Sequence, residues 1–265
     1  MNAPPRISVV TICRNVLPAL RRTVASVQAQ HYPALEYWIV DAASTDGTAG
    51  YLAQLEAQGV RVLSEPDRGI SDAMNKGIRL ATGEWIAHLH ADDTYLPGTL
   101  EAVARAAEAG GADVLCGHIL KREPTGGVLC RTAPERLAIE MSVPHPAVFA
   151  RRELWERLGG FDPALRNAMD YDLFLRARAA GARFRVIDRP LAVVAWGGQS
   201  ERSLWKTLRE THDLRRRHLR SGASRSWLFL VFLFLKGKVR MALQGAGLAG
   251  LVAWYRRNLS IPRKG

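Results

Sequence analysis

The feature that most constrains the fold is an alternation of short apolar, β-branched runs with segments of helical periodicity. The apolar runs lie at residues 7–12, 35–40, 60–63 and 85–89, and a segment of helical length separates each from the next. The β-branched run 7–12 is typical of a strand buried in a parallel sheet, and each of the other three has the length of a short strand. Parallel neighbours need right-handed crossover connections. The pattern therefore predicts an α/β fold with a mostly parallel central sheet flanked by helices.

The second half of the chain is less regular. An Ala-rich segment at 99–109 predicts a helix, and residues 118–132 predict a hairpin that turns at Thr125-Gly126-Gly127. Two short β-branched runs, at 184–187 and 191–195, each predict a strand. Residues 201–220 predict a basic helix that Ser200 would cap.

Acidic residues recur where the apolar runs end. Asp41 follows the second run, Asp67 lies in the loop after the third, and the pair Asp92-Asp93 follows the fourth. Turn formation and helix capping explain an isolated example of such residues well. Because the carboxyl ends of parallel strands share one edge of a sheet, however, these acids are expected to converge on one cleft. Buried carboxylates need a counter-charge or a metal ion, so the recurrence indicates a ligand site.

The charge of the chain divides it into two parts. Residues 1–200 carry 22 Lys and Arg against 22 Asp and Glu, whereas residues 201–265 carry 15 against 3 and supply the whole net charge of +12. The division predicts a neutral domain at 1–200 and a basic, apolar helical tail at 201–265. Such asymmetry indicates an acidic partner surface, either anionic lipid or nucleic acid. The basic run lacks the interleaved aromatic residues of a base-stacking surface, which disfavours nucleic acid.

The tail contains a continuous apolar stretch at 227–235, which is well short of the ~20 residues that cross a bilayer. Lys236, Lys238 and Arg240 interrupt the longer stretch 227–254, where charge is costly inside a membrane. The tail therefore predicts an interfacial helical pair on an anionic membrane surface, with a dimerisation arm as the alternative. Three widely spaced cysteines and no secretory signal favour a reducing cytoplasm. We expect a peripheral protein on the inner face of the cell membrane, in which oligomers are possible.

A series of motifs in fixed order resembles the family 2 glycosyltransferases, which have the GT-A fold. The resemblance covers roughly residues 6–200 and includes members that assemble bacterial polysaccharides. Each motif is weak alone, but the ordered set is specific. The motifs are Ile7–Asn15, Asp41–Thr48, Glu65–Gly77, Ala81–Gly83, Asp92-Asp93, His145–Phe149, Gly159–Asp162 and Asp170–Arg176.

The resemblance implies roles for four residues toward a nucleotide-sugar donor. Thr11 and Asn15 would lie beside the nucleotide, in the first loop. Asp41 would accept a hydrogen bond from the nucleobase. Arg68 would supply positive charge near the base or the diphosphate.

The resemblance also implies a Mn²⁺ or Mg²⁺ cofactor, for which carboxylates are suitable ligands. Asp93 would be the direct metal ligand, and Asp92 would hold the ribose or the sugar. The family's Asp-X-Asp motif is read here as Ala91-Asp92-Asp93, so its first carboxylate position is occupied by His90 or Ala91.

Asp170 matches the catalytic Asp of the family's Glu-Asp pair, with Met169 in the Glu position. It would act as the general base that takes the proton of the acceptor hydroxyl. Helix capping is the alternative role for Asp170, and both roles can coexist. His145, between two prolines, is more often a structural or acceptor-facing residue than a ligand. Residues 196–200 resemble a mobile loop of the family that closes over donor or acceptor.

The resemblance therefore implies an inverting, metal-dependent glycosyltransferase of surface polysaccharide biosynthesis. It would transfer a sugar from a nucleotide-sugar donor to a saccharide or lipid-linked acceptor. The donor expected first is a UDP-sugar. The alternative is a non-catalytic, membrane-docked nucleotide-sugar-binding module, which Met169 alone supports. A nucleotidyltransferase is disfavoured, because residues 11–15 lack a glycine-rich phosphate loop.

Overall fold

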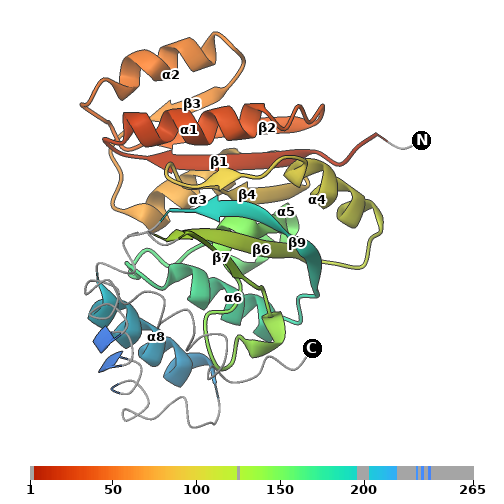
Figure 1. Ribbon diagram of the computed structural model, residues 1–265, viewed down its shortest axis with the longest axis vertical. Helices are drawn as coiled ribbons and strands as arrows, with labels where there is room; N and C mark the ends of the chain where they lie inside the picture. The colour runs from red at the N-terminus through yellow and green to blue at the C-terminus, as the bar shows by residue number, and fades with distance from the viewer. Residues whose placement is uncertain are drawn as a thin grey trace.

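The computed structural model describes residues 3–123, 126–195 and 203–219, together with five single positions between 231 and 239. Within these residues a nine-stranded mixed sheet forms the centre of the molecule, in the order β3-β2-β1-β4-β8-β6-β9-β5, and β7 pairs with β6 (Figure 1). The strands are β1 (Ile7–Cys13), β2 (Leu35–Asp41), β3 (Arg61–Ser64), β4 (Trp85–His88), β5 (Thr94–Tyr95), β6 (Val114–Glu123), β7 (Gly126–Cys130), β8 (Val148–Arg151) and β9 (Phe184–Val194). The α-helices are α1 (Leu17–Gln28), α2 (Thr48–Glu56), α3 (Ile70–Leu80), α4 (Thr99–Glu108), α5 (Arg152–Leu158), α6 (Met169–Ala179) and α8 (Leu204–His218).

The first half of the sheet is parallel, which confirms the predicted α/β fold. β1 pairs in parallel with both β2 and β4, and β2 pairs in parallel with β3. The register sets Cys13 opposite Asp41, and Asp41 opposite Ser64. The last residues of these three strands therefore lie in one row at the carboxyl edge of the sheet.

The second half of the sheet is mixed. β8 is antiparallel to both β4 and β6, whereas β6 and β9 are parallel. The predicted hairpin is confirmed as β6 and β7, but Gly126 and Gly127, which were predicted to form its turn, pair with β6 as the first residues of β7. The runs predicted as two strands form one long strand, β9, whose pairing with β6 shifts register on either side of His118. At Gly117 a Cβ atom would lie 2.4 Å from Cγ of Leu191, so the absence of a side chain permits this close approach.

The two faces of the sheet are covered by different helices. Alternate residues of β1 point to opposite faces, so that Val9 contributes to one core and Val10 to the other. Helices α1, α2 and α4 pack on the first face, and α3, α5 and α6 pack on the second. Trp85 on β4 is 1% exposed. Each fully buried side chain of this kind contributes about 1.5–3 kcal/mol to stability.

Helix α8 is the described part of the predicted tail. It begins at Leu204 after Ser203, and its buried Leu214 joins the core on the α6 side of the sheet. The predicted cap Ser200, the loop 196–200 and most of the apolar stretches 227–235 and 241–254 lie outside the described residues. Among the helices that the structure does describe, none has the length and apolarity needed to cross a membrane. The division of the chain at residue 200 stays a prediction.

Candidate active site

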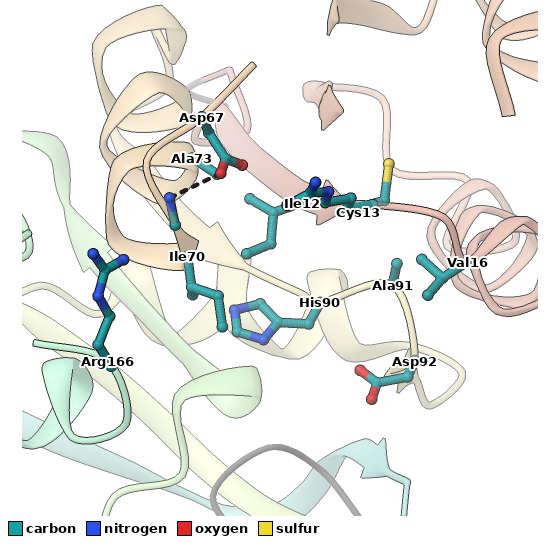
Figure 2. Close-up of a pocket in the computed structure, with 12 residues that line it drawn as sticks. Ile12, Cys13, Val16, Asp67, Ile70, Ala73, His90, Ala91, Asp92 and Arg166 are labelled. Carbon is teal, nitrogen blue, oxygen red and sulfur yellow. Dashed lines mark hydrogen bonds between the residues drawn. The ribbon is translucent and has the colours of Figure 1, made fainter. Parts of the chain in front are cut away.

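A pocket of about 410 Å³ opens at the carboxyl ends of β1 and β4. Four segments line it: the end of β1 with its following loop, the loop that enters α3, the loop after β4, and the loop before α6. Figure 2 shows Asp92 and Arg166 on opposite sides of the pocket, with the imidazole of His90 between them. Open α/β sheets bind ligands at such an edge. The lining residues are Ile12, Cys13, Arg14, Val16, Asp67, Gly69, Ile70, Ala73, His90, Ala91, Asp92 and Arg166.

The loop that enters α3 holds a guanidinium group at the pocket wall. The N–H of Gly69 donates to Oδ1 of Asp67 at 2.8 Å, and the N–H of Arg68 donates to Oδ2 of Asp72 at 3.0 Å. Gly69 has a φ of +121°, and a Cβ atom there would lie 2.2 Å from Nη1 of Arg166. That nitrogen donates to the carbonyl of Arg68 at 2.6 Å. Glycine at position 69 therefore allows Arg166 to reach the pocket.

Asp41, at the end of β2, is 1% exposed and is held by neighbouring donors. Its Oδ2 accepts from the N–H of Ser44 at 3.0 Å and from Oγ of Ser64 at 2.7 Å, while its Oδ1 accepts from Oγ of Ser44. The thiol of Cys13 also donates to Oδ1, at 3.5 Å. Burial, followed by the charge of Asp41, raises the pKa of Cys13, so this thiol stays neutral. These contacts hold the carboxylate in one position.

Asn15 and Thr11 both organise the region around the first loop. Asn15 is exposed with a φ of 52°, and its Oδ1 accepts from the N–H of Thr45 at 2.7 Å. Its own N–H donates to Oγ of Ser44 at 2.8 Å. Thr11 is fully buried, and its hydroxyl lies 3.0 Å from that of Tyr37. Asn15 thus joins the loops after β1 and β2 at the sheet edge.

The two adjacent acids after β4 have different surroundings. Asp92 is exposed and lines the pocket, whereas Asp93 is 4% exposed. The hydroxyl of Thr23 donates to the carbonyl of Asp93 at 2.7 Å, which fixes this turn against α1. Burial, followed by the charge of Asp92, raises the pKa of Asp93 to about 7, although the charge of His145 and the N–H of Ala195 oppose the rise. The surroundings of Asp93 therefore provide too little positive charge to stabilise its ionised form fully.

A chain of three side chains connects the pocket to Asp170. The rings of His90 and His145 lie 4.4 Å apart, and Nδ1 of His145 lies 3.6 Å from Oδ2 of Asp170. Oδ1 of Asp170 accepts from the N–H of Tyr171 at 2.8 Å, within the first turn of α6. Burial alone would lower the pKa of His145, but the hydrogen bond and charge of Asp170 and the charges of Asp93 and Asp92 raise it. The neighbouring carboxylates therefore favour the protonated form of the His145 imidazole.

His90 has the opposite electrostatic setting. Burial, followed by the charges of the neighbouring histidines, lowers the pKa of His90 well below its usual range. Nε2 of His90 and Nε2 of His145 are both buried, and neither has a hydrogen-bond partner among the described residues. Unpaired buried polar atoms are costly, so their presence is typical of a site completed by a ligand.

The residues at this edge fit a hard divalent cation. No group of three His, Cys, Asp or Glu side chains among the described residues could enclose a metal ion. Mg²⁺ and similar ions, however, are usually held by one or two carboxylates together with substrate phosphates. Asp92 offers an exposed carboxylate on the pocket wall, and the charge of His145 only partly offsets the cost of burying Asp93 beside it.

The structure brings some of the predicted site residues together and leaves others apart. Asp92 lines the pocket, and Asp170 approaches it through His145 and His90. Arg68 is exposed and pairs with Asp72 at 3.6 Å, and its carbonyl rather than its guanidinium contacts the lining residue Arg166. The other predicted residues lie at the same sheet edge but outside the pocket lining: Thr11, Asn15, Asp41 and Asp93. Their roles toward a donor stay predictions.

Sequence reasoning missed two basic residues of the pocket, Arg14 and Arg166. Arg14 lies within the first motif, and its place between Thr11 and Asn15 could have indicated that it lies beside the donor site. Arg166 carries no such signal, because its place depends on the contact between the loop before α6 and the glycine turn before α3.

The sequence matches those of known proteins over most of its length. The model of glycosyl transferase family 2 matches residues 8–141, which is half of the chain. "Uncharacterized glycosyltransferase Rv1514c" of Mycobacterium tuberculosis is 36% identical over 186 residues, covering 67% of this chain and 70% of that protein. A "PGL/p-HBAD biosynthesis glycosyltransferase" of Mycobacterium bovis BCG is 27% identical over 263 residues, covering 96% and 99%. The chain therefore belongs to glycosyl transferase family 2, and the resemblance seen in its motifs is confirmed.

Solved structures confirm the GT-A fold. Staphylococcus aureus TarS 1–349 in complex with UDP-GlcNAc superposes with a TM-score of 0.64 at 19% identity, covering 79% of this chain and 66% of that one. The chain thus spans just under two thirds of that structure. The mannosyltransferase PcManGT from Pyrobaculum calidifontis, in complex with GDP-Man and Mn²⁺, superposes with a TM-score of 0.63 at 22% identity, covering 98% and 78%.

Proposed function

We propose that this glycosyltransferase is metal-dependent and inverting, and that it moves a sugar from a nucleotide-sugar donor to a saccharide or lipid-linked acceptor. Family membership supports the reaction class. The relative named for PGL/p-HBAD biosynthesis supports a glycolipid or polysaccharide product. The structural neighbours in complex with UDP-GlcNAc and GDP-Man support a nucleotide-sugar donor.

The donor would occupy the pocket with its diphosphate toward Arg14 and Arg166, because guanidinium groups bind phosphate oxygens in bidentate fashion. Asp41 would accept the ring N–H of the base, and Thr11 and Asn15 would shape the loop around the nucleotide. Uracil and guanine both carry such an N–H group. We propose a UDP-sugar as the first candidate donor and a GDP-sugar as the second.

Mn²⁺ or Mg²⁺ would be held by Asp93, with Asp92 contacting the ribose or the sugar. When bound, the cation would neutralise the charge that develops on the departing nucleoside diphosphate. The raised pKa of Asp93 supports this assignment, since a buried carboxylate whose charge is only partly offset gains from a nearby cation. Asp92 precedes Asp93 directly in the sequence and lies on the pocket wall, so it would contact the same donor that the cation binds.

The general base would be Asp170, and the single observation that carries this proposal is its connection to the pocket. His145 pairs with Oδ2 of Asp170, and its ring contacts the tilted ring of His90, which lines the pocket. The carboxyl side chain of Asp170 is 22% exposed, so an acceptor hydroxyl can reach it. The buried Met169 cannot supply the second carboxylate of the family pattern, and His145 supplies Asp170 with a polar partner.

In the proposed step Asp170 removes the proton from the acceptor hydroxyl as its oxygen attacks the anomeric carbon. The new bond joins the acceptor oxygen to that carbon, and the bond from the carbon to the phosphate oxygen breaks. The nucleoside diphosphate leaves with the electron pair, from the face opposite the attack. The anomeric centre is therefore inverted.

A panel of labelled UDP- and GDP-sugars, incubated with Mn²⁺ and lipid extracts, tests the proposal. The expected result is release of the nucleoside diphosphate from one donor, with transfer of its sugar to an extracted acceptor. Binding of a donor without any turnover would overturn the enzymatic proposal and favour the membrane-docked binding module.

We further propose that the basic face of α8 docks on an anionic lipid surface. The exposed positions of the helix carry four basic residues, Lys206, Arg209, Arg216 and Arg217, against one acidic residue, Asp213, and the aromatic Trp205 is exposed beside them. Each basic residue near an anionic membrane contributes about 1 kcal/mol of attraction. Sedimentation with phosphatidylglycerol vesicles should be stronger than with phosphatidylcholine vesicles, and equal sedimentation would contradict the proposal.

A further inference from the structure

One carboxylate of α8 accepts hydrogen bonds from the last three backbone N–H groups before α6. Glu210 Oε1 accepts from the N–H of Arg166 at 3.2 Å, and its Oε2 accepts from the N–H groups of Asn167 at 2.8 Å and Ala168 at 2.9 Å. The side-chain Nδ2 of Asn167 donates to Oε1 at 3.2 Å. A carboxylate offers about four acceptor sites, so this group is fully used by the loop.

The loop held in this way joins two parts of the proposed active site. At its beginning, the side chain of Arg166 lines the pocket. At its end, Ala168 is followed directly by α6, which carries Asp170 in its first turn. Ala168 has no polar side chain that could cap the helix. The loop therefore depends on an acceptor from another element, because buried N–H groups need partners.

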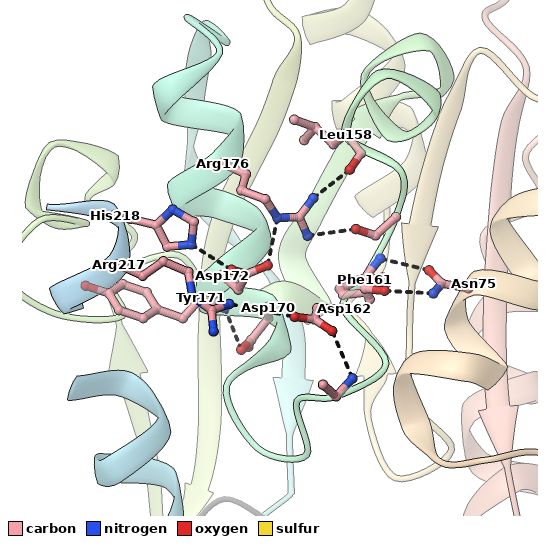
Figure 3. A network of polar contacts seen from close by, with 12 residues as sticks. Asn75, Leu158, Phe161, Asp162, Asp170, Tyr171, Asp172, Arg176, Arg217 and His218 are labelled. Atoms are coloured by element: carbon pink, nitrogen blue, oxygen red, sulfur yellow. Dashed lines mark hydrogen bonds and ion pairs between the residues drawn. The ribbon is translucent and has the colours of Figure 1, made fainter. Parts of the chain in front are cut away.

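Helix α8 is itself fixed against α6, so Glu210 is not a loose side chain. Nε2 of His218 lies 2.8 Å from Oδ1 of Asp172, and Nε of Arg176 donates to Oδ2 of the same buried carboxylate at 2.7 Å (Figure 3). Leu214, between Glu210 and His218 on one face of α8, is buried in the core. Contacts at both ends of this face hold the helix in a single position.

We infer that Glu210 is the positioning residue of the active site and that it sets the places of Arg166 and Asp170 together. This inference rests on the proposed function. A carboxylate on a fixed helix binds the loop at its centre, and the guanidinium and the general base extend from the loop's two ends. A loosened loop would therefore misplace the general base and the pocket arginine in the same variant.

Glu210→Gln tests the inference, because the amide keeps the shape of the side chain but replaces one acceptor oxygen with a donor. We expect kcat to fall about 10- to 100-fold, as for other misplacements of about 1 Å, with the protein still folded by circular dichroism. Affinity for UDP or GDP should fall as well, through Arg166. The matched control is Asp213→Asn, which removes an exposed carboxylate from the same helix and should leave both values within about two-fold of wild type.

Amide hydrogen exchange of the unliganded protein provides a readout that does not depend on turnover. Glu210→Gln should accelerate exchange at Arg166, Asn167 and Ala168, and Asp213→Asn should not. If Glu210→Gln does not fold, Asn167→Ala removes one of the four hydrogen bonds and should produce a smaller effect of the same kind. Normal kcat and unchanged exchange in the folded variants would overturn the inference. If wild type turns over no donor, the proposed function fails, while exchange and nucleotide affinity still decide the role of Glu210.

Discussion

Replacing Asp93 with Asn should stabilise the unliganded protein at alkaline pH. The pKa of Asp93 rises from its usual 3.8 to about 7 in the folded protein, first because the carboxyl is buried and then because Asp92 lies beside it. Between these two values the folded state binds more protons than the unfolded state. Wild-type stability therefore falls as the pH rises through this window. Asn cannot ionise, so Asp93→Asn escapes the loss.

The magnitude follows from the two pKa values. At 1.36 kcal/mol for each pKa unit, the full cost of ionising Asp93 in the folded protein is about 4 kcal/mol, reached above about pH 8. Roughly 3 kcal/mol of this develops between about pH 4.5 and pH 8.5. The Asn amide adds a cost of about 1–3 kcal/mol for an unpaired N–H group, but this cost is the same at both pH values.

Urea unfolding followed by tryptophan fluorescence, at both pH values, measures the effect. The free energy of unfolding of Asp93→Asn minus that of wild type should be about 3 kcal/mol larger at the higher pH, which means a more stable variant. The control is Asp213→Asn, which removes an exposed carboxylate from α8 and should show no such pH dependence. Mn²⁺ with UDP should stabilise wild type more than Asp93→Asn at the higher pH. A difference that does not change with pH would refute the reasoning.

Two further predictions concern the pocket and the core. Arg166→Ala should weaken UDP or GDP affinity, measured by calorimetry, about 10-fold or more, since a hydrogen bond from a charged group contributes about 1.5–3 kcal/mol. The exposed Arg178 of α6 is its control, and equal losses in both variants would contradict a specific contact. Gly77→Ala should lower stability by about 1–3 kcal/mol, because its Cβ would lie 2.2 Å from Cγ1 of Val10. The control is Gly50→Ala on α2, where no atom lies near the added methyl group, and it should raise the melting temperature. If Gly77→Ala were stabilising instead, the neighbouring side chains would have to move aside without cost, which would contradict the prediction.

The sequence predicted the parallel half of the fold better than the mixed half. In the parallel half each strand is a single, mostly apolar run between helices, so period and length were sufficient. β5 was missed because it consists only of Thr94 and Tyr95, and its pairing with β9 is set by a distant part of the chain. β9 was divided in two because Asp188-Arg189-Pro190 interrupts its apolar pattern, and its pairing irregularity is invisible in a linear sequence.

The site residues, like the strands, were predictable only where they depend on local sequence. Asp92 was found because it ends a buried strand, and strand ends share one edge of the sheet. The link from Asp170 through His145 to His90 could not be predicted, because it joins α6, the segment before β8 and the loop after β4. Glu210 was not singled out, since four hydrogen bonds to a loop over 40 residues earlier leave no pattern in the sequence.

The central claim is that Asp170 removes the acceptor's proton during sugar transfer from a nucleotide donor. Its most direct test is the rate of nucleoside diphosphate release and sugar transfer by wild type and by Asp170→Asn, with the donor that the panel identifies. We predict that Asp170→Asn lowers kcat by about 10²- to 10⁴-fold while the affinity for UDP or GDP stays at the wild-type value. Transfer by folded Asp170→Asn at the wild-type rate would contradict the account.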